Sequence, residues 1–144
     1  MTLYLDTSSL VKLYVQEVGS EDVRSLVAQA AVVSSSIVAY PEARAALARL
    51  RRSRDLTAAQ FAAAKRNFEE QWPAFLTLEV TAAVSREAGD LADRYALRGF
   101  DALHLASFAE VARRAGRSDT RFSSYDAPLN KAARDVARRL SPDL

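Results

Sequence analysis

The chain has 144 residues, close to the commonest size of a single domain, so one domain over residues 1–144 is expected. Hydrophobic residues make up 49% and charged residues 26% of the sequence, which argues against a disordered or fibrous protein. Because the chain has no cysteine, disulfides, thiolate zinc sites and a thiol nucleophile are excluded. A bound metal would have to use oxygen ligands or His104, the single histidine.

No membrane segment or signal peptide is expected from the apolar pattern. The apolar stretches are short and interrupted by charged residues, whereas a bilayer span takes about 20 apolar residues. Asp6 lies where the apolar stretch of a signal peptide would begin, and no basic segment precedes it. We therefore expect a cytoplasmic protein that does not contact membranes.

The N-terminal part predicts a strand, two helices and a second strand. TLYL at 2–5 contains β-forming residues and is followed by Asp6, Thr7 and Ser8, which are helix-capping types, before the apolar LVKLYV. A second helix is expected to start at Ser20, and AVVSS at 31–35 predicts a short buried strand.

Two helices are expected in the middle of the chain. Residues 36–54 have a helical pattern, and Pro41 favours a regular start at that residue, because proline suits the first helical position. Thr57 and Gln60 form a candidate capping box for the next helix. The near-helical spacing of its apolar residues indicates core or dimer interface rather than a cofactor site; these residues are Phe61, Ala64, Phe68 and Trp72.

The C-terminal part again alternates strands and helices. FLTLEV at 75–80 predicts a strand, Thr81 caps a helix, and Asp101 opens a helix that ends at Gly116. TRFSSYD predicts a strand ending at Asp126, although it is more polar than a central strand of a parallel sheet. LNKAARDVARRL at 129–140 predicts a last helix, or a helix with an edge strand.

Four carboxylates stand out by their placement at the ends of strands or the starts of helices: Asp6, Glu42, Asp101 and Asp126. Alternating strands and helices imply a parallel sheet covered on both faces, with sites at the carboxyl ends of its strands. Helix capping alone explains any one of these residues. Together they indicate a site for a hard divalent ion, whose natural chemistry is phosphodiester hydrolysis.

An ordered set of motifs then carries a family resemblance. DTSSLVKLY after the first strand, YPEARAAL around Glu42, GFDALHLA with Asp101 and FSSYD with Asp126 resemble the successive motifs of PIN-domain proteins. More narrowly, they resemble VapC-type ribonuclease toxins of toxin–antitoxin pairs, from residue 3 to about 134. The resemblance implies a three-layer α/β/α sandwich around a mainly parallel sheet, and a single PIN-like nuclease domain.

The resemblance also implies a set of site residues. Asp6 and Asp101 would be the principal ligands of Mg²⁺ or Mn²⁺, and Glu42 and Asp126 would complete the acidic pocket directly or through water. Ser8 and Ser124 match small hydroxyl positions that support the carboxylates. The polar stretch before Asp126 departs from the family pattern and leaves Asp119 as a competitor, while Pro41 leaves the direction of Glu42 open.

Other polar residues have simpler explanations. His104, on the apolar run ALHLA, is expected to be hydrogen-bonded and partly buried, with orientation of Asp101 as its largest role in function. Two groups of arginines could follow RNA phosphates or meet an antitoxin, and solvated helix faces explain them equally well: Arg44, Arg49, Arg51, Arg52 and Arg54, and Arg113, Arg114 and Arg117.

The favoured function is a metal-dependent endoribonuclease, with a homodimer and an antitoxin that binds the active cleft implied by the resemblance. A PIN-like domain that binds RNA or protein without cutting is the alternative. A phosphatase with an Asp nucleophile is less favoured, because DTSS has no second acid two residues after Asp6 and no matching lysine motif is present.

Overall fold

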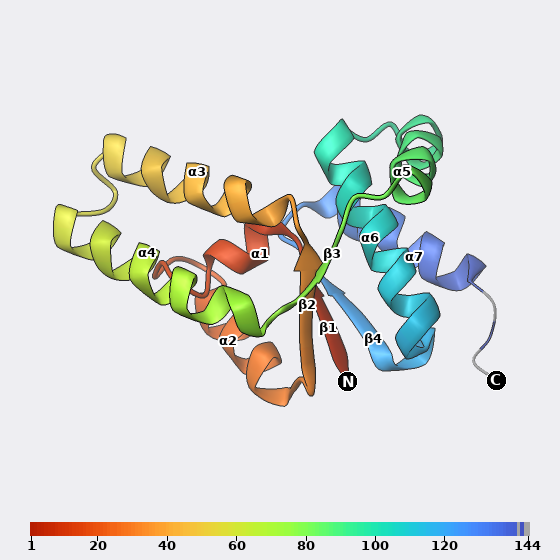
Figure 1. The fold of residues 1–144 in the computed structure, drawn as a ribbon, viewed down its shortest axis with the longest axis horizontal. Helices are drawn as coiled ribbons and strands as arrows, with labels where there is room; N and C mark the ends of the chain where they lie inside the picture. Colours follow the sequence, from red (N-terminus) through yellow and green to blue (C-terminus); the bar gives the residue numbers. More distant parts are fainter. Residues whose placement is uncertain (141, 143–144) are drawn as a thin grey trace.

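A four-stranded parallel sheet forms the centre of the computed structural model, which describes residues 1–140 and 142 (Figure 1). Its strands run in the order β3-β2-β1-β4. Their bounds are Thr2–Leu5 for β1, Val32–Ser36 for β2, Leu76–Leu78 for β3 and Thr120–Ser123 for β4. The predicted α/β class with a parallel sheet is confirmed.

Helices cover both faces of the sheet, because successive side chains of β1 point to opposite sides. Leu3 and Leu5 are buried in one hydrophobic cluster and Tyr4 in the other. The first cluster lies under α1 (Thr7–Val11), α2 (Ser20–Gln29), α3 (Ala39–Arg52) and α4 (Ala58–Gln71). The second lies under α5 (Ala82–Tyr95), α6 (Gly99–Ala115) and α7 (Ala127–Arg139). This is the predicted three-layer sandwich (Figure 1).

The last strand is polar because it lies at an edge. Within the described residues β4 pairs with β1 alone, and the Arg121 side chain is exposed, so the polarity of this segment suits its place in the sheet. The predicted end of the strand at Asp126 is wrong, because β4 stops at Ser123. In the described part of the chain the segment after it is helix α7 alone, without a further strand.

Two helix starts differ from the sequence prediction. Helix α3 begins at Ala39 rather than at Pro41, and the proline fits because a residue in the first turn needs no helical N–H donor. Helix α6 begins at Gly99, so Asp101 lies within its first turn instead of opening it.

Helices α3 and α4 form a hairpin that extends to one side of the sheet (Figure 1). The predicted capping box at its turn is confirmed, with Thr57 accepting from the Gln60 N–H and Gln60 accepting from the Thr57 N–H. Phe68 is fully buried against Tyr14, Tyr40 and Trp72, so the apolar stripe of α4 belongs to the core. Short 3₁₀ turns, Trp72–Ala74 and Arg117–Asp119, lead into β3 and β4. Within residues 1–140, no helix has the length and apolar character of a membrane span.

The packing of α3 gives a stability prediction. Leu47 is 1% exposed, so Leu47→Ala leaves a cavity and is expected to lower the free energy of unfolding by about 2–5 kcal/mol in urea titrations. Leu76→Ala is the matched control, because Leu76 is 50% exposed on β3, and its cost should stay below about 1 kcal/mol. Equal losses for the two variants would contradict the position of Leu47 in the core.

Candidate active site

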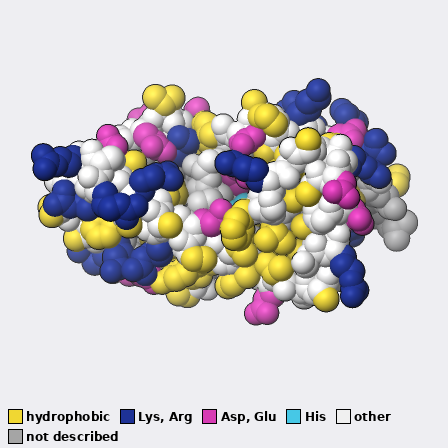
Figure 2. All heavy atoms as spheres, turned by 90° about the horizontal axis from the view of Figure 1, so that it is seen from above, with side chains coloured by type: hydrophobic (Ala, Val, Ile, Leu, Met, Phe, Trp, Pro, Cys, Tyr) yellow, Lys and Arg dark blue, Asp and Glu magenta, His cyan; other side chains and the backbone are white. Residues whose placement is uncertain are grey.

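The carboxyl ends of the four parallel strands meet at one edge of the sheet, and the site is built there. Figure 2 looks onto this edge and shows a hollow between the two helical layers, with acidic side chains and the single histidine inside it. Asp6 directly follows β1, one of the two central strands, and therefore lies in the middle of this edge.

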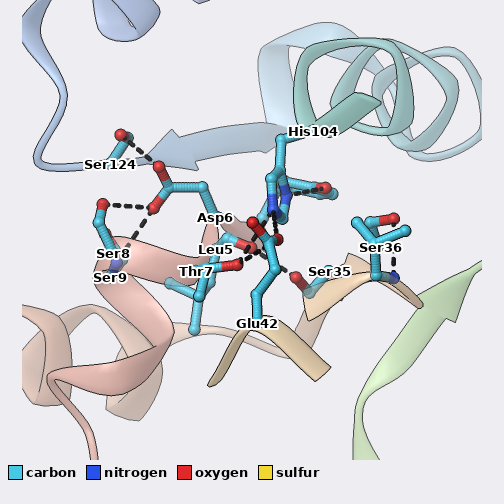
Figure 3. Close-up of polar contacts among 12 residues, drawn as sticks. Leu5, Asp6, Thr7, Ser8, Ser9, Ser35, Ser36, Glu42, His104 and Ser124 are labelled. Atoms are coloured by element: carbon cyan, nitrogen blue, oxygen red, sulfur yellow. Dashed lines mark hydrogen bonds and ion pairs between the residues drawn. The ribbon is translucent and has the colours of Figure 1, made fainter. Parts of the chain in front are cut away.

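The Asp6 carboxylate is 4% exposed and held by three donors. Its Oδ1 accepts from the Ser8 hydroxyl at 2.7 Å and from the Ser9 N–H at 3.0 Å, which makes Asp6 the N-cap of α1. Its Oδ2 accepts from the Ser124 hydroxyl at 2.5 Å. Figure 3 shows the carboxylate pointing toward these three residues from two segments far apart in sequence.

The charge of Asp6 is poorly compensated. Burial raises the pKa of the Asp6 carboxyl, although the hydrogen bonds from Ser124 and Ser8 oppose this effect. Within the described part of the chain, no lysine or arginine side chain forms an ion pair with Asp6. A buried carboxylate with hydrogen-bond donors but no cationic partner is a suitable ligand for a hard cation.

The loop after β4 is tied to the same carboxylate through two hydroxyls. The Ser124 hydroxyl that donates to Asp6 accepts the N–H of Asp126 at 3.0 Å. The Ser8 hydroxyl likewise accepts the N–H of Tyr125 at 3.0 Å. Ser8 and Ser124 therefore fix both the carboxylate and the loop that runs past it.

Glu42 belongs to a second network next to Asp6 (Figure 3). Its Oε1 accepts from the Thr7 hydroxyl at 2.7 Å and lies 2.8 Å from Nε2 of His104, whose Nδ1 lies 2.9 Å from the Tyr4 hydroxyl. A neutral imidazole with its proton on Nε2 donates to Glu42 and accepts from Tyr4. Burial acts to raise the pKa of the Glu42 carboxyl, but the bonds from His104 and Thr7 outweigh it and lower that pKa.

His104 is 2% exposed and hydrogen-bonded at both nitrogens. This confirms the expected hydrogen-bonded side chain, but the contact is with Glu42 and not with Asp101, the orientation of which was the largest role considered for His104. Thr7 and Tyr4 are members of this network that sequence reasoning did not identify. Thr7 was visible only as a capping type beside Asp6, and Tyr4, in a buried strand, gave no signal beyond core.

The remaining predicted carboxylates have local partners. Oδ2 of Asp101 accepts from Nε of Arg98 at 3.1 Å. Asp126 is the N-cap of α7 and its Oδ1 accepts from the Leu129 N–H at 3.0 Å. Over residues 1–140 and 142, no group of three or more acidic or histidine side chains is arranged to hold a metal ion.

Asp119, the predicted competitor of Asp126, lies at the opposite edge of the sheet. It precedes β4 and lies 3.4 Å from the N-terminal amino group of Met1, which precedes β1. The amino ends of parallel strands are remote from the carboxyl edge, so Asp119 does not face the site.

A groove of about 500 Å³ opens next to Glu42, between α1 and α3. Its polar lining includes Thr7, Ser8, Lys12, Glu42 and Arg49. Basic side chains gather over the far end of the α3–α4 hairpin (Figure 2).

The later arginines, in contrast, lie toward the end of α6 away from the site. They have partners there: Arg113 with Glu87 and Glu110, Arg114 with Glu110, and Arg117 with the Leu140 carbonyl.

This fold, with acidic side chains at the carboxyl edge of a short parallel sheet, is that of a PIN domain, and the chain belongs to the PIN-domain family, whose sequence profile matches residues 3–128. It is similar to two Mycobacterium tuberculosis proteins, Ribonuclease VapC45 of strain CDC 1551 / Oshkosh and Ribonuclease VapC49 of strain ATCC 25618 / H37Rv. Each is 40% identical over 140 residues, which cover 97% of this chain and 94% of the relative. The family predicted from the ordered motifs is confirmed.

The buried charge of Asp6 predicts a stabilising substitution. The pKa of the Asp6 carboxyl is raised in the folded chain, so the protonated form stabilises the fold. This stabilisation is fully present below the ordinary carboxyl pKa and is lost as the pH rises through the folded pKa. Asn keeps the cap without the charge, so Asp6→Asn in EDTA should raise the free energy of unfolding at pH 7 by roughly 0.5–2 kcal/mol.

Chemical denaturation across pH provides the measurement, and the gain should shrink toward about pH 4. Asp93→Asn, on an exposed position of α5, is the control and should change little. Destabilisation by Asp6→Asn at pH 7 would contradict an uncompensated charge at this position.

Proposed function

We propose that the protein is a metal-dependent endoribonuclease that hydrolyses RNA phosphodiester bonds, and that residues 1–144 form one nuclease domain acting in the cytoplasm. The main support for this function is the buried carboxylate of Asp6, which has three hydrogen-bond donors and no cationic side-chain partner in the described chain. The 40% identity to two proteins named ribonucleases supports RNA as the substrate.

The donor set suits Mg²⁺ or Mn²⁺, because every candidate ligand is a carboxylate oxygen. Asp6 and Asp101 are the proposed principal ligands, Glu42 completes the pocket, and Asp126 contributes through the oxygen that does not cap α7. The ion pair between Asp101 and Arg98 is solvent-exposed on the arginine side and contributes at most about 1 kcal/mol, so a divalent ion can displace it.

A divalent ion bound here would supply a water of lowered pKa and stabilise the charge that develops on the phosphate. The chain itself supplies orientation. Glu42 is kept ionised and is fixed by Thr7 and His104, so we assign it the role of positioning the attacking water. Ser8 and Ser124 hold Asp6 in place from two segments of the chain.

We propose three partners: an RNA substrate and, as the similarity to VapC-type toxins implies, a cognate antitoxin protein and a second copy of the chain. The groove at Glu42 adjoins a second groove along the α3–α4 hairpin, since both are lined by Glu17 and Leu50, and an antitoxin segment bound there would cover the site. Support for a homodimer comes from an apolar hollow between α5 and α6 that includes Phe100, which is 57% exposed.

Cleavage of RNA by the purified protein in Mg²⁺ or Mn²⁺ tests the proposal. Asp6→Asn and Asp101→Asn should each lower the rate by at least about 100-fold, and EDTA should abolish cleavage. Asp93→Asn is the matched control and should cut normally. Circular dichroism would verify that each variant is folded.

Activity that survives both substitutions or EDTA would contradict the metal mechanism. A folded wild-type protein that binds RNA and cuts none of a mixed-sequence pool would favour the alternative, a PIN-like module that only binds. Glu42→Gln and Asp126→Asn complete the series, and the smaller loss is expected for Asp126, whose Oδ1 is engaged as a helix cap.

The Arg98–Asp101 pair gives a prediction on metal affinity. Arg98→Ala removes the side chain that competes with the cation for Asp101, so the Kd for Mn²⁺ measured by titration calorimetry should fall by up to about fivefold. Arg86→Ala is the control, because Arg86 is an exposed arginine on α5, the helix that packs against α6. Unchanged or weaker Mn²⁺ binding by Arg98→Ala would show that Asp101 is not a ligand or that Arg98 does not compete for it.

A further inference from the structure

Tyr125 is a solvent-exposed aromatic side chain at the border of the acidic pocket. It is 46% exposed and follows Ser124, whose hydroxyl donates to Asp6. Its own N–H donates to the Ser8 hydroxyl, which also donates to Asp6. The ring is thus attached to backbone whose position is fixed by the same two serines that hold the proposed metal ligand.

The ring itself is also held in place. The Tyr125 hydroxyl donates to the Gly19 carbonyl at 3.1 Å, and Nζ of Lys12 lies 4.4 Å from the ring centroid. Gly19 has φ 93° and a Cβ there would lie 2.6 Å from the ring, so only glycine lets the tyrosine approach so closely. Lys12 is in turn paired with Glu17 at 3.0 Å.

The position of the ring is unusual for a packing residue. Lys12 lies over the ring and Gly19 lies at its hydroxyl edge, yet nearly half of the residue remains in contact with solvent. Among the described residues, no other aromatic ring stacks on Tyr125. Lys12 and Ser8, which both contact Tyr125, also line the groove that includes Glu42, so the ring adjoins residues of that groove.

We propose that Tyr125 is a stacking platform for one base of single-stranded RNA, next to the nucleotide whose phosphate enters the acidic pocket. The proposal rests on the nuclease function above. Single-stranded nucleic acids are held by aromatic faces together with basic groups, and a base stacks on a ring whatever its sequence. Because hydrogen bonds connect the ring to Gly19 and its backbone to Ser8, which holds Asp6, stacking would set which phosphate reaches the carboxylates.

The test is equilibrium binding of fluorescein-labelled single-stranded RNA octamers of mixed sequence, in Mg²⁺, to the cleavage-deficient Asp101→Asn protein. In this background Tyr125→Leu should weaken binding about tenfold. Tyr125→Phe and Tyr125→Trp keep an aromatic face and should stay within about twofold of the parent. Tyr95→Leu is the matched control, because Tyr95 is another hydrogen-bonded tyrosine but lies on α5, where its hydroxyl donates to Asp135.

Single abasic sites placed along the RNA give a readout that a structural role of Tyr125 would not change. One abasic position should weaken binding to the Asp101→Asn protein about tenfold, and that penalty should disappear when Tyr125→Leu is added. The scan with Tyr125 intact needs no ring variant, so the absence of any sensitive position would contradict the platform even if Tyr125→Leu lowers the Tm.

Three results would overturn the platform while leaving the nuclease intact. These are full affinity of Tyr125→Leu, a loss in Tyr125→Phe as large as in Tyr125→Leu, or no abasic position that weakens binding. The second result would assign the effect to the hydroxyl bond with Gly19. Failure of the wild-type protein to cut and of the parent variant to bind any octamer would instead overturn the nuclease function together with the platform.

Discussion

A carboxylate without a cationic side-chain partner, buried at the end of a central strand, is the constraint around which the described structure is arranged. Asp6 is placed by β1 at the middle of the carboxyl edge, and it begins α1 by accepting from the Ser9 N–H. Its remaining hydrogen-bonding capacity is filled by Ser8 and by Ser124 from a segment more than one hundred residues away. The fold thus brings together the donors that a buried charge requires, yet no lysine or arginine of the described residues pairs with it.

The three other predicted ligands, Glu42, Asp101 and Asp126, each have a partner of their own in the protein. Glu42 is bonded to Thr7 and His104, and Asp101 is paired with Arg98. Such local pairing avoids the repulsion that several converging carboxylates would suffer. It also means that a bound ion would have to compete with protein groups for these carboxylates. The ion pair of Asp101 is exposed and therefore weaker, whereas the hydrogen bonds of Glu42 are half-buried.

The local sequence predicted the order of strands and helices and the position of Asp6, because alternating segments and capping residues act over a few positions. The Thr57–Gln60 box is a clear example. Contacts between distant segments were not predictable in this way. Tyr4 and His104 are one hundred positions apart, and nothing in either segment indicates that they meet. The end of the last strand was predicted three residues too late, at Asp126, because a polar edge strand and the loop that follows it have similar composition.

The chain of hydrogen bonds from Tyr4 through His104 to Glu42 has a mechanical consequence for the whole molecule. Tyr4 and His104 belong to the side of the sheet covered by α5, α6 and α7, whereas Glu42 is carried by α3 on the other side. The two outer layers are therefore joined by polar contacts just beyond the end of the sheet. A shift of one layer against the other would stretch these contacts, so the carboxyl edge of the sheet also constrains the alignment of the two layers.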